Sequence, residues 1–177
     1  MALAGIILDY LSILFAVMTI HDSSRSLSLA RNVTTLAHAT GLERAIENFH
    51  AEYGALPDVG NHLTTDSADG VKLLVILLGI EPESDTVRNP RMIRFLNFLR
   101  EGKNKRGGLI YNSTRTLPDG LYDAWGNPFT VELAKPGEQN VHFTISAKTI
   151  DLPGRRVAVY SPGMDKALGT VDDIKTW

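Results

Sequence analysis

Residues 42–57, LERAIENFHAEYGALP, decide the fold of this chain. Their apolar side chains recur every three or four residues, which is the spacing of one face of an α-helix, and their charged side chains lie off that face. Gly54 and Pro57 then end the helical pattern. The same face continues towards the N-terminus, so that its apolar positions are Leu29, Val33, Leu36, Leu42, Ile46, Phe49 and Tyr53.

Residues 2–20, ahead of this stretch, form the one long apolar segment, interrupted by Asp9. At about 1.5 Å per residue, the segment is just long enough to cross a hydrocarbon core of about 30 Å. We therefore expect one continuous or once-broken helix from about residue 3 to residue 53. A buried helix of a soluble domain is the alternative. Arg25 and Arg31 follow the segment, so the charge rule alone would keep the C-terminal part in the cytoplasm.

Residues 67–106 predict a helical insertion with two helices. Ser67 is placed to cap a short apolar helix over residues 71–78. Asn89 and Pro90 form a second helix-start signal, because Asn is a common N-cap and Pro is common at the first helical position. The apolar stripe of this second helix would be Met92, Phe95, Leu96 and Leu99.

The periodicity changes to two after Asp119, which is typical of β-strands. Residues 129–133, 141–145 and 156–160 are the expected strands, joined by short turns that contain Pro and Gly. Short connections favour an antiparallel meander. The predicted fold class is therefore α+β, with the amphipathic part of the long helix covering one face of a small antiparallel sheet.

Composition and motifs count against an enzyme. The 177 residues carry a net charge of −2 and no cysteine, which excludes cysteine nucleophiles, disulfides and cysteine-based zinc sites. The five histidines are scattered, and the chain contains no HExxH, GxSxG, P-loop or GxGxxG motif. We expect no catalytic residues.

Residues 88–106 hold the one marked charge asymmetry. Glu101 is the single acid in this segment, against the bases Arg88, Arg91, Arg94, Arg100, Lys103, Lys105 and Arg106. The segment could bind nucleic acid or another anionic surface. The simpler interpretation, which we favour, is a solvated face with a basic loop.

Residues 161–177 place three carboxylates, Asp165, Asp172 and Asp173, among turn-forming residues directly after an expected strand. Adjacent aspartates repel each other, and an oxygen-ligated calcium ion would neutralise them. Aspartates in glycine-rich loops also serve simply as turn and capping residues. The spacing alone leaves both interpretations open, but it is not that of an EF-hand.

Three segments resemble one known family. Residues 123–129, DAWGNPF, resemble the Asp-Pro-Trp-Gly-Asn-Pro-Tyr signature of the major pseudopilins of the type II secretion system. Residues 161–177, SPGMDKALGTVDDIKTW, resemble the calcium loop of that family, and residues 52–57, EYGALP, are similar to its Gly-x-x-Pro helix exit. The family cleavage motif, Gly-Phe-Thr-Leu-Ile-Glu, does not occur in this sequence, which counts against processing by a prepilin peptidase.

The resemblance implies a filament subunit that works by assembly. Residues 1–26 would form a transmembrane and filament-core helix, and residues 27–177 a periplasmic domain carrying the insertion 67–106 and the calcium loop 161–177. The implied partners are further copies of the chain, other pseudopilins, the secretion platform and the bacterial inner membrane. A DNA- or surface-binding filament subunit using residues 88–106 and a soluble calcium-stabilised binding domain are the alternatives.

The resemblance also assigns roles to single residues. It places calcium on the side chains of Asp165, Asp172 and Asp173, with a backbone carbonyl near Pro162 and the hydroxyl of Ser161 as further ligands. In this family an acidic residue near the start of the helix meets the N-terminal amine of a neighbouring subunit. Asp9 is the candidate for that assembly role.

Overall fold

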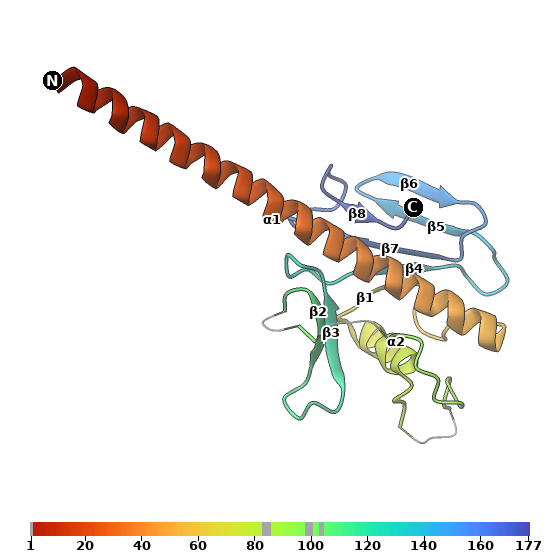
Figure 1. Cartoon of the computed structure of the whole chain (residues 1–177). Coiled ribbons are helices and arrows are strands. Elements are labelled where there is room, and N and C mark those ends of the chain that lie inside the picture. The colour runs from red at the N-terminus through yellow and green to blue at the C-terminus, as the bar shows by residue number, and fades with distance from the viewer. Residues whose placement is uncertain (1, 83–85, 98–100, 103–104) are drawn as a thin grey trace.

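The long helix is the dominant element of the computed structural model, which describes residues 2–82, 86–97, 101–102 and 105–177, with side chains from residue 25 onward. Helix α1 (Ala2–Tyr53) is continuous, and its N-terminal half extends beyond the rest of the chain (Figure 1). Gly54 adopts a positive φ of 74° and donates its backbone N–H to the carbonyl of His50. This left-handed residue ends the helix where the sequence predicts the end.

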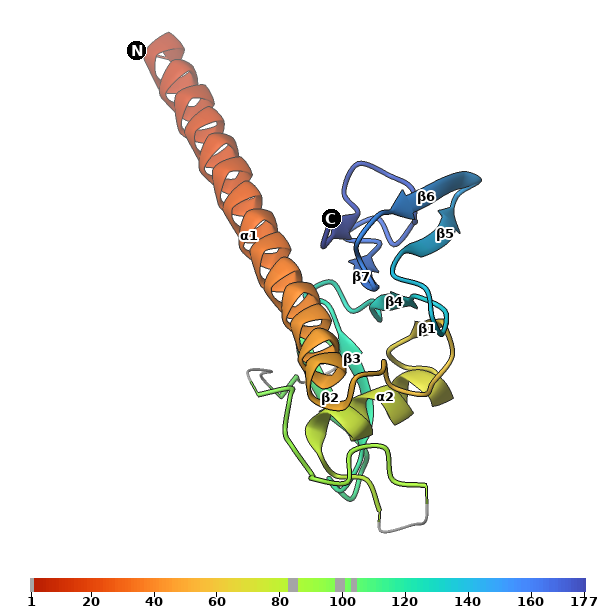
Figure 2. The same ribbon diagram turned by 90° about the vertical axis from the view of Figure 1, so that its right-hand side faces the viewer.

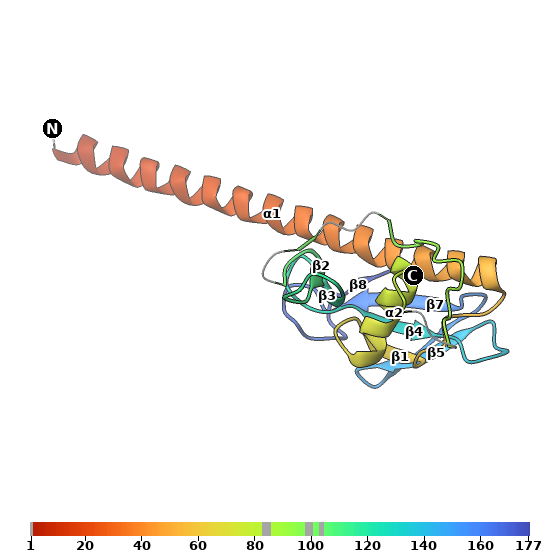
Figure 3. The same cartoon turned by 90° about the horizontal axis from the view of Figure 1, so that it is seen from below.

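An antiparallel four-stranded sheet packs against the C-terminal half of α1. Its order is β1 (His62–Thr64), β4 (Thr130–Leu133), β7 (Val157–Ser161) and β8 (Ile174–Lys175). Helix α1 contacts β7 and β8. The chain is therefore α+β, as predicted, with the helix lying along one face of the sheet (Figure 3).

Two hairpins complete the described strands. The first pairs β2 (Gly108–Tyr111) with β3 (Pro118–Tyr122), and the second pairs β5 (Val141–Ile145) with β6 (Lys148–Leu152). The strands predicted at 129–133, 141–145 and 156–160 correspond to β4, β5 and β7. The sequence pattern missed β1, β2, β3, β6 and β8.

The predicted meander is wrong. Strand β4 pairs with β7, whereas β5 leaves the sheet and pairs with β6. The reason is burial, since every residue of β4 and β7 is buried and both faces of these strands need a cover. On the face away from the main core, Phe143 of β5 stacks on Tyr160 of β7 with ring centroids 5.6 Å apart, and Trp177 packs edge-on against both rings.

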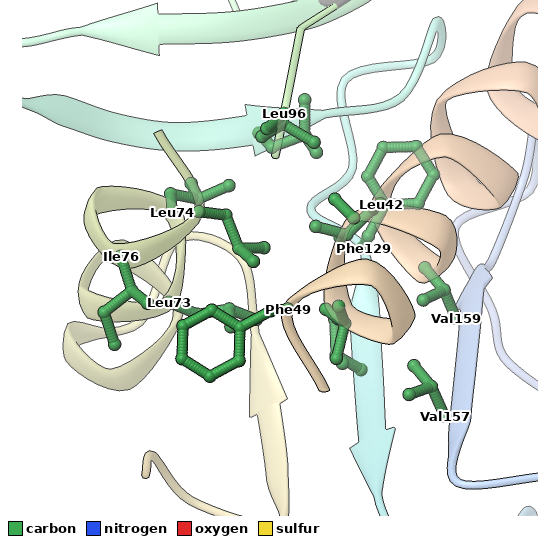
Figure 4. Close-up of a cluster of buried hydrophobic side chains, with 14 of the residues drawn as sticks. Leu42, Phe49, Leu73, Leu74, Ile76, Leu96, Phe129, Val157 and Val159 are labelled. Atoms are coloured by element: carbon green, nitrogen blue, oxygen red, sulfur yellow. The ribbon is translucent and has the colours of Figure 1, made fainter. Parts of the chain in front are cut away.

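Helix α2 (Ala68–Leu78) confirms the first helix of the insertion. The side chain of Ser67 accepts a hydrogen bond from the backbone N–H of Gly70 at 3.1 Å, which is the expected N-cap. The helix lies at the centre of the core rather than outside it. Its buried side chains meet those of α1 and the sheet in one hydrophobic cluster that includes Leu42, Phe49, Leu73, Leu74, Phe129, Val157 and Val159 (Figure 4).

The prediction of a second helix in the insertion is wrong, because residues 90–97 form turns and irregular chain. Asn89 is buried and does not cap a helix. Its amide nitrogen donates to the carbonyls of Ile76 and Ile93 at 2.8 Å each, and its amide oxygen accepts from the Tyr53 hydroxyl at 2.7 Å. The backbone N–H groups of Phe95 and Leu96 bind the Leu77 carbonyl, so the segment follows the end of α2 instead of coiling.

The apolar face of α1 is buried over only part of its predicted length. Leu42, Ile46 and Phe49 are at most 3 % exposed. By contrast, Leu29 is 66 % exposed and Val33 is 61 % exposed. The sheet and α2 reach only the C-terminal part of the helix.

Candidate metal centre

A buried carboxylate organises the turn at residues 123–128. Asp123 is 0 % exposed, and its Oδ1 accepts the backbone N–H groups of Trp125 and Asn127 at 2.8 and 2.7 Å. Its Oδ2 accepts the side-chain amide of Asn127 at 2.9 Å and the hydroxyl of Ser161. A buried carboxylate needs such donors in place of water. The turn is therefore a hydrogen-bonded unit with Asp123 at its centre.

This turn is attached to helix α1. The indole Nε1 of Trp125 donates to the amide oxygen of Asn32 at 3.1 Å, and the guanidinium carbon of Arg31 lies 4.8 Å from the centre of the Trp125 ring. The backbone N–H of Ala124 donates to the hydroxyl of Thr35 at 3.2 Å. Trp125 thus anchors the turn through both a hydrogen bond and a cation–π contact.

The turn is joined on its other side to the acidic loop, residues 161–173. Ser161 donates to Asp123 and accepts the backbone N–H of Gly163 at 3.2 Å. The amide of Asn127 donates to the Gly163 carbonyl at 2.7 Å. Gly163 has a φ of +67°, and a Cβ there would overlap the carbonyl oxygen of Asp172, so only glycine fits this close approach. The start of the loop is held by the turn.

The three predicted carboxylates lie in this loop and hold it by hydrogen bonds. Asp165 accepts the N–H of Ala167 at 2.8 Å, and Asp173 accepts the N–H of Gly169 at 2.9 Å. Asp172 accepts the backbone N–H of Asp165 at 2.9 Å with one oxygen and the Thr170 hydroxyl at 2.6 Å with the other. These bonds, that from Thr170 first, lower the pKa of Asp172 and keep it ionised.

The two carboxylate oxygens of Asp173 have different surroundings. Its side chain is 0 % exposed, and one oxygen pairs with the ammonium of Lys175 at 3.1 Å. The other oxygen, Oδ1, is buried and has no hydrogen-bond partner. A buried carboxylate oxygen without a donor is costly unless a cation or water meets it. This orphaned oxygen, in a loop with two further carboxylates, fits a hard cation such as calcium.

The described residues do not include a preformed cluster of three or more His, Asp or Glu side chains suited to hold a metal. The backbone N–H of Asp165 donates to the Asp172 carboxylate, whereas the fully buried side chain of Asp173 pairs with Lys175. Of the other predicted ligands, Ser161 is buried and bound to Asp123, and Pro162 is half-buried at the start of the loop. Asp9 lies outside the residues whose side chains are described.

The sequence pattern did not indicate that the turn at residues 123–128 and the acidic loop, residues 161–173, form one site. Asp123, Asn127 and Thr35 were not singled out as functional residues, although their contacts join the turn, the acidic loop and α1. The spacing Asp-x-Trp-x-Asn was the available signal, because an aspartate can accept N–H groups two and four residues further on, as Asp123 does. No local pattern indicated Ser161 as its distant partner.

Several described bases of the segment 88–106 have partners elsewhere in the chain, whereas Arg100 and Lys103 lie outside the described residues. Arg88 lies within 4.0 Å of the carboxylates of Asp58 and Glu81, and Arg91 pairs with Glu52. Lys105 lies over the Tyr122 ring at 5.1 Å. Asp58 and Glu52 come from distant parts of the chain, and they offset part of the positive charge that is concentrated in the sequence.

Comparisons with protein-family models, with curated proteins and with solved structures found no match for this chain.

Among the residues described with their side chains, none belongs to a helix long and apolar enough to span a membrane. The expected apolar segment, residues 2–20, precedes those residues.

Proposed function

We propose that this chain is a structural subunit of a pseudopilus or a related type IV-like filament in protein secretion, and that it works by assembly rather than catalysis. Residues 1–26 anchor it in a bacterial inner membrane, and residues 27–177 stand in the periplasm. Its partners are further copies of itself, other pseudopilins and the secretion platform, and Asp9 serves subunit assembly. The α+β fold with its long N-terminal helix supports the proposal.

One observation carries the proposal furthest. The Trp-Gly-Asn turn and the acidic loop, which are distant in sequence, are joined through Asp123 to Ser161 and Asn127 to Gly163. The same turn is fastened to α1 through Asn32 and Thr35. A rigid connection from the long helix to a surface loop suits a subunit whose surfaces must keep a fixed relation along a filament.

Calcium has a structural role in this proposal. Asp165, Asp172 and Asp173 would hold the ion, with Pro162 supplying a carbonyl. The ion would supply positive charge to the orphaned oxygen of Asp173 and to its two neighbours in the loop. Loop 161–173 would then become more rigid, without any chemical step.

Thermal unfolding of the full-length protein in detergent, with calcium and with a chelator, tests the metal. At a calcium concentration about 100-fold above the dissociation constant, binding adds about 2.7 kcal/mol to the free energy of unfolding. For a chain of this size, this raises the melting temperature by roughly 5–11 °C. The Asp172→Asn, Asp173→Asn variant should lose the response, and the exposed-site control Asp119→Asn should keep it. Identical melting curves with calcium and with chelator would refute the metal site.

Sedimentation of the same full-length protein tests assembly. A filament subunit should form large multimers when detergent is removed, and electron microscopy should show fibres. A calcium response without multimers would support the alternative of a calcium-stabilised binding domain and would overturn the filament proposal.

A further inference from the structure

The acidic loop presents apolar side chains to solvent. Met164 is 57 % exposed, Leu168 is 38 % exposed and Val171 is fully exposed, although the loop around them is held by hydrogen bonds. Ser146 of the β5–β6 turn adds a further restraint, because its hydroxyl donates to the Leu168 carbonyl at 2.6 Å. The loop therefore displays three apolar side chains on a restrained frame, which lowers the entropic cost of binding.

An apolar groove lies along α1, beside the irregular segment that follows α2. It has a volume of about 610 Å³, and its apolar lining includes Val33, Leu36, Ala37 and Phe95. Val33 and Leu36 are 61 % and 43 % exposed, and the exposed Leu29 continues the same helical face. A contiguous open apolar face of this kind marks an interaction surface.

The groove and the loop carry opposite charges. Arg44 is exposed and lines the groove, and the described residues that line it with Arg44 include no acidic one. None of the ion pairs among the described residues involves Arg44. Asp165 is exposed in the loop, close to Met164 in sequence, and Asp172 is half-buried beside Val171. Such complementarity favours one pairing and steers association.

The loop cannot fill the groove of its own molecule. Figure 2 shows the C-terminal strands and their loop on one side of α1, and the segment that follows α2 on the other side. We infer that the loop 161–173 of one copy docks into the groove along α1 and Phe95 of a second copy, with Asp165 facing Arg44. A carboxylate has two oxygens, so Asp165 can meet Arg44 with one of them and the proposed calcium ion with the other. The two surfaces differ, so the contact is heterologous, and a pair of copies retains one free loop on one copy and one free groove on the other. It deepens the proposed filament function, on which it rests, by naming two surfaces that join successive subunits.

Cysteine cross-linking tests the contact, because the chain contains no cysteine. In the full-length Val171→Cys, Leu36→Cys protein, a short bis-maleimide should give a covalent ladder of dimers, trimers and larger products. The single Val171→Cys variant should stop at dimers. The control Val171→Cys, Leu117→Cys should give no ladder, because Leu117 is similarly exposed but lies on the β2–β3 connection.

A charge inserted at the tip of the loop gives a second measurement. Val171→Asp leaves folding unchanged, because the side chain is fully exposed, but it should lower the association constant at least about tenfold. Leu117→Asp should leave the association constant unchanged.

The outcomes separate the contact from the filament proposal. Multimers of the unmodified protein without a ladder specific to positions 36 and 171 would overturn the docking contact and leave filament assembly standing. Absence of multimers from the unmodified protein would overturn both. A ladder together with weakened association of Val171→Asp supports the contact.

Discussion

The buried carboxylate of Asp123 offers the sharpest test of how the turn and the acidic loop are joined. In an Asp123→Asn variant, the amide oxygen can still accept the backbone N–H groups of Trp125 and Asn127. The amide nitrogen, however, replaces the oxygen that accepts the Asn127 side chain and the Ser161 hydroxyl. The Ser161 hydroxyl can rotate and accept a hydrogen bond, but the Asn127 amide would face another donor.

The cost follows from these contacts. A buried donor left without an acceptor lowers the free energy of unfolding by about 1–3 kcal/mol. Each hydrogen bond to a charged oxygen that becomes a hydrogen bond to a neutral one lowers it by about 1 kcal/mol. Removing a buried negative charge returns part of this cost. We expect the free energy of unfolding to fall by about 2–3 kcal/mol, which lowers the melting temperature by roughly 4–12 °C for a chain of this length.

Circular dichroism during heating measures this change in the full-length protein, and Trp125 fluorescence reports on the turn itself. The matched control is Asp119→Asn, because Asp119 is exposed on β3 and should change stability by less than about 0.5 kcal/mol. If Asp123→Asn is as stable as this control, the buried carboxylate does not hold the turn and loop together.

Three further predictions follow from burial and backbone geometry. Burial lowers the pKa of His38 below its ordinary value of 6.5, against an opposing effect of Asp123, so the unfolded chain takes up a proton before the folded one does. The free energy of unfolding should therefore fall as the pH drops below about 6.5. If a His38→Gln variant loses as much stability as the unmodified protein between pH 7.5 and 5.5, His38 is not the group responsible. Gly163→Ala should destabilise the protein by more than about 1 kcal/mol in urea unfolding, because its φ is positive and the added Cβ overlaps Asp172; wild-type stability would show that the loop is not tightly packed there. Phe49→Ala should lower the free energy of unfolding by about 3–5 kcal/mol, whereas Val33→Ala, at an exposed position, should lower it by less than about 0.5 kcal/mol. Equal losses for the two variants in a denaturant titration would place the core elsewhere on α1.

Much of the local structure could be predicted because its causes are local. The end of α1 at Tyr53, the cap of α2 at Ser67 and the strand at Val141–Ile145 each depend on residues within a few positions of one another. The same reasoning failed at Asn89. Its side chain can cap a helix, but in the folded chain it binds Ile76, Ile93 and Tyr53, and these contacts decide the conformation.

The candidate site could be predicted only in part for the same reason. The carboxylates Asp165, Asp172 and Asp173 were recognisable in the sequence, whether as turn residues or as metal ligands. The distant bond from Ser161 to Asp123 was not, and it gives the Ser161 hydroxyl a place in the frame of the loop.

The sequence by itself determined the long helix, the α+β class, the short capped helix and the acidic character of the C-terminal loop, because periodicity, capping and charge are properties of neighbouring residues. Only the tertiary structure decided which half of the helical apolar face is buried and that β4 pairs with β7. It alone decided that the basic residues Arg88 and Arg91 meet distant carboxylates. These outcomes depend on competition for burial and for charge partners among segments far apart in the chain, which no local pattern records.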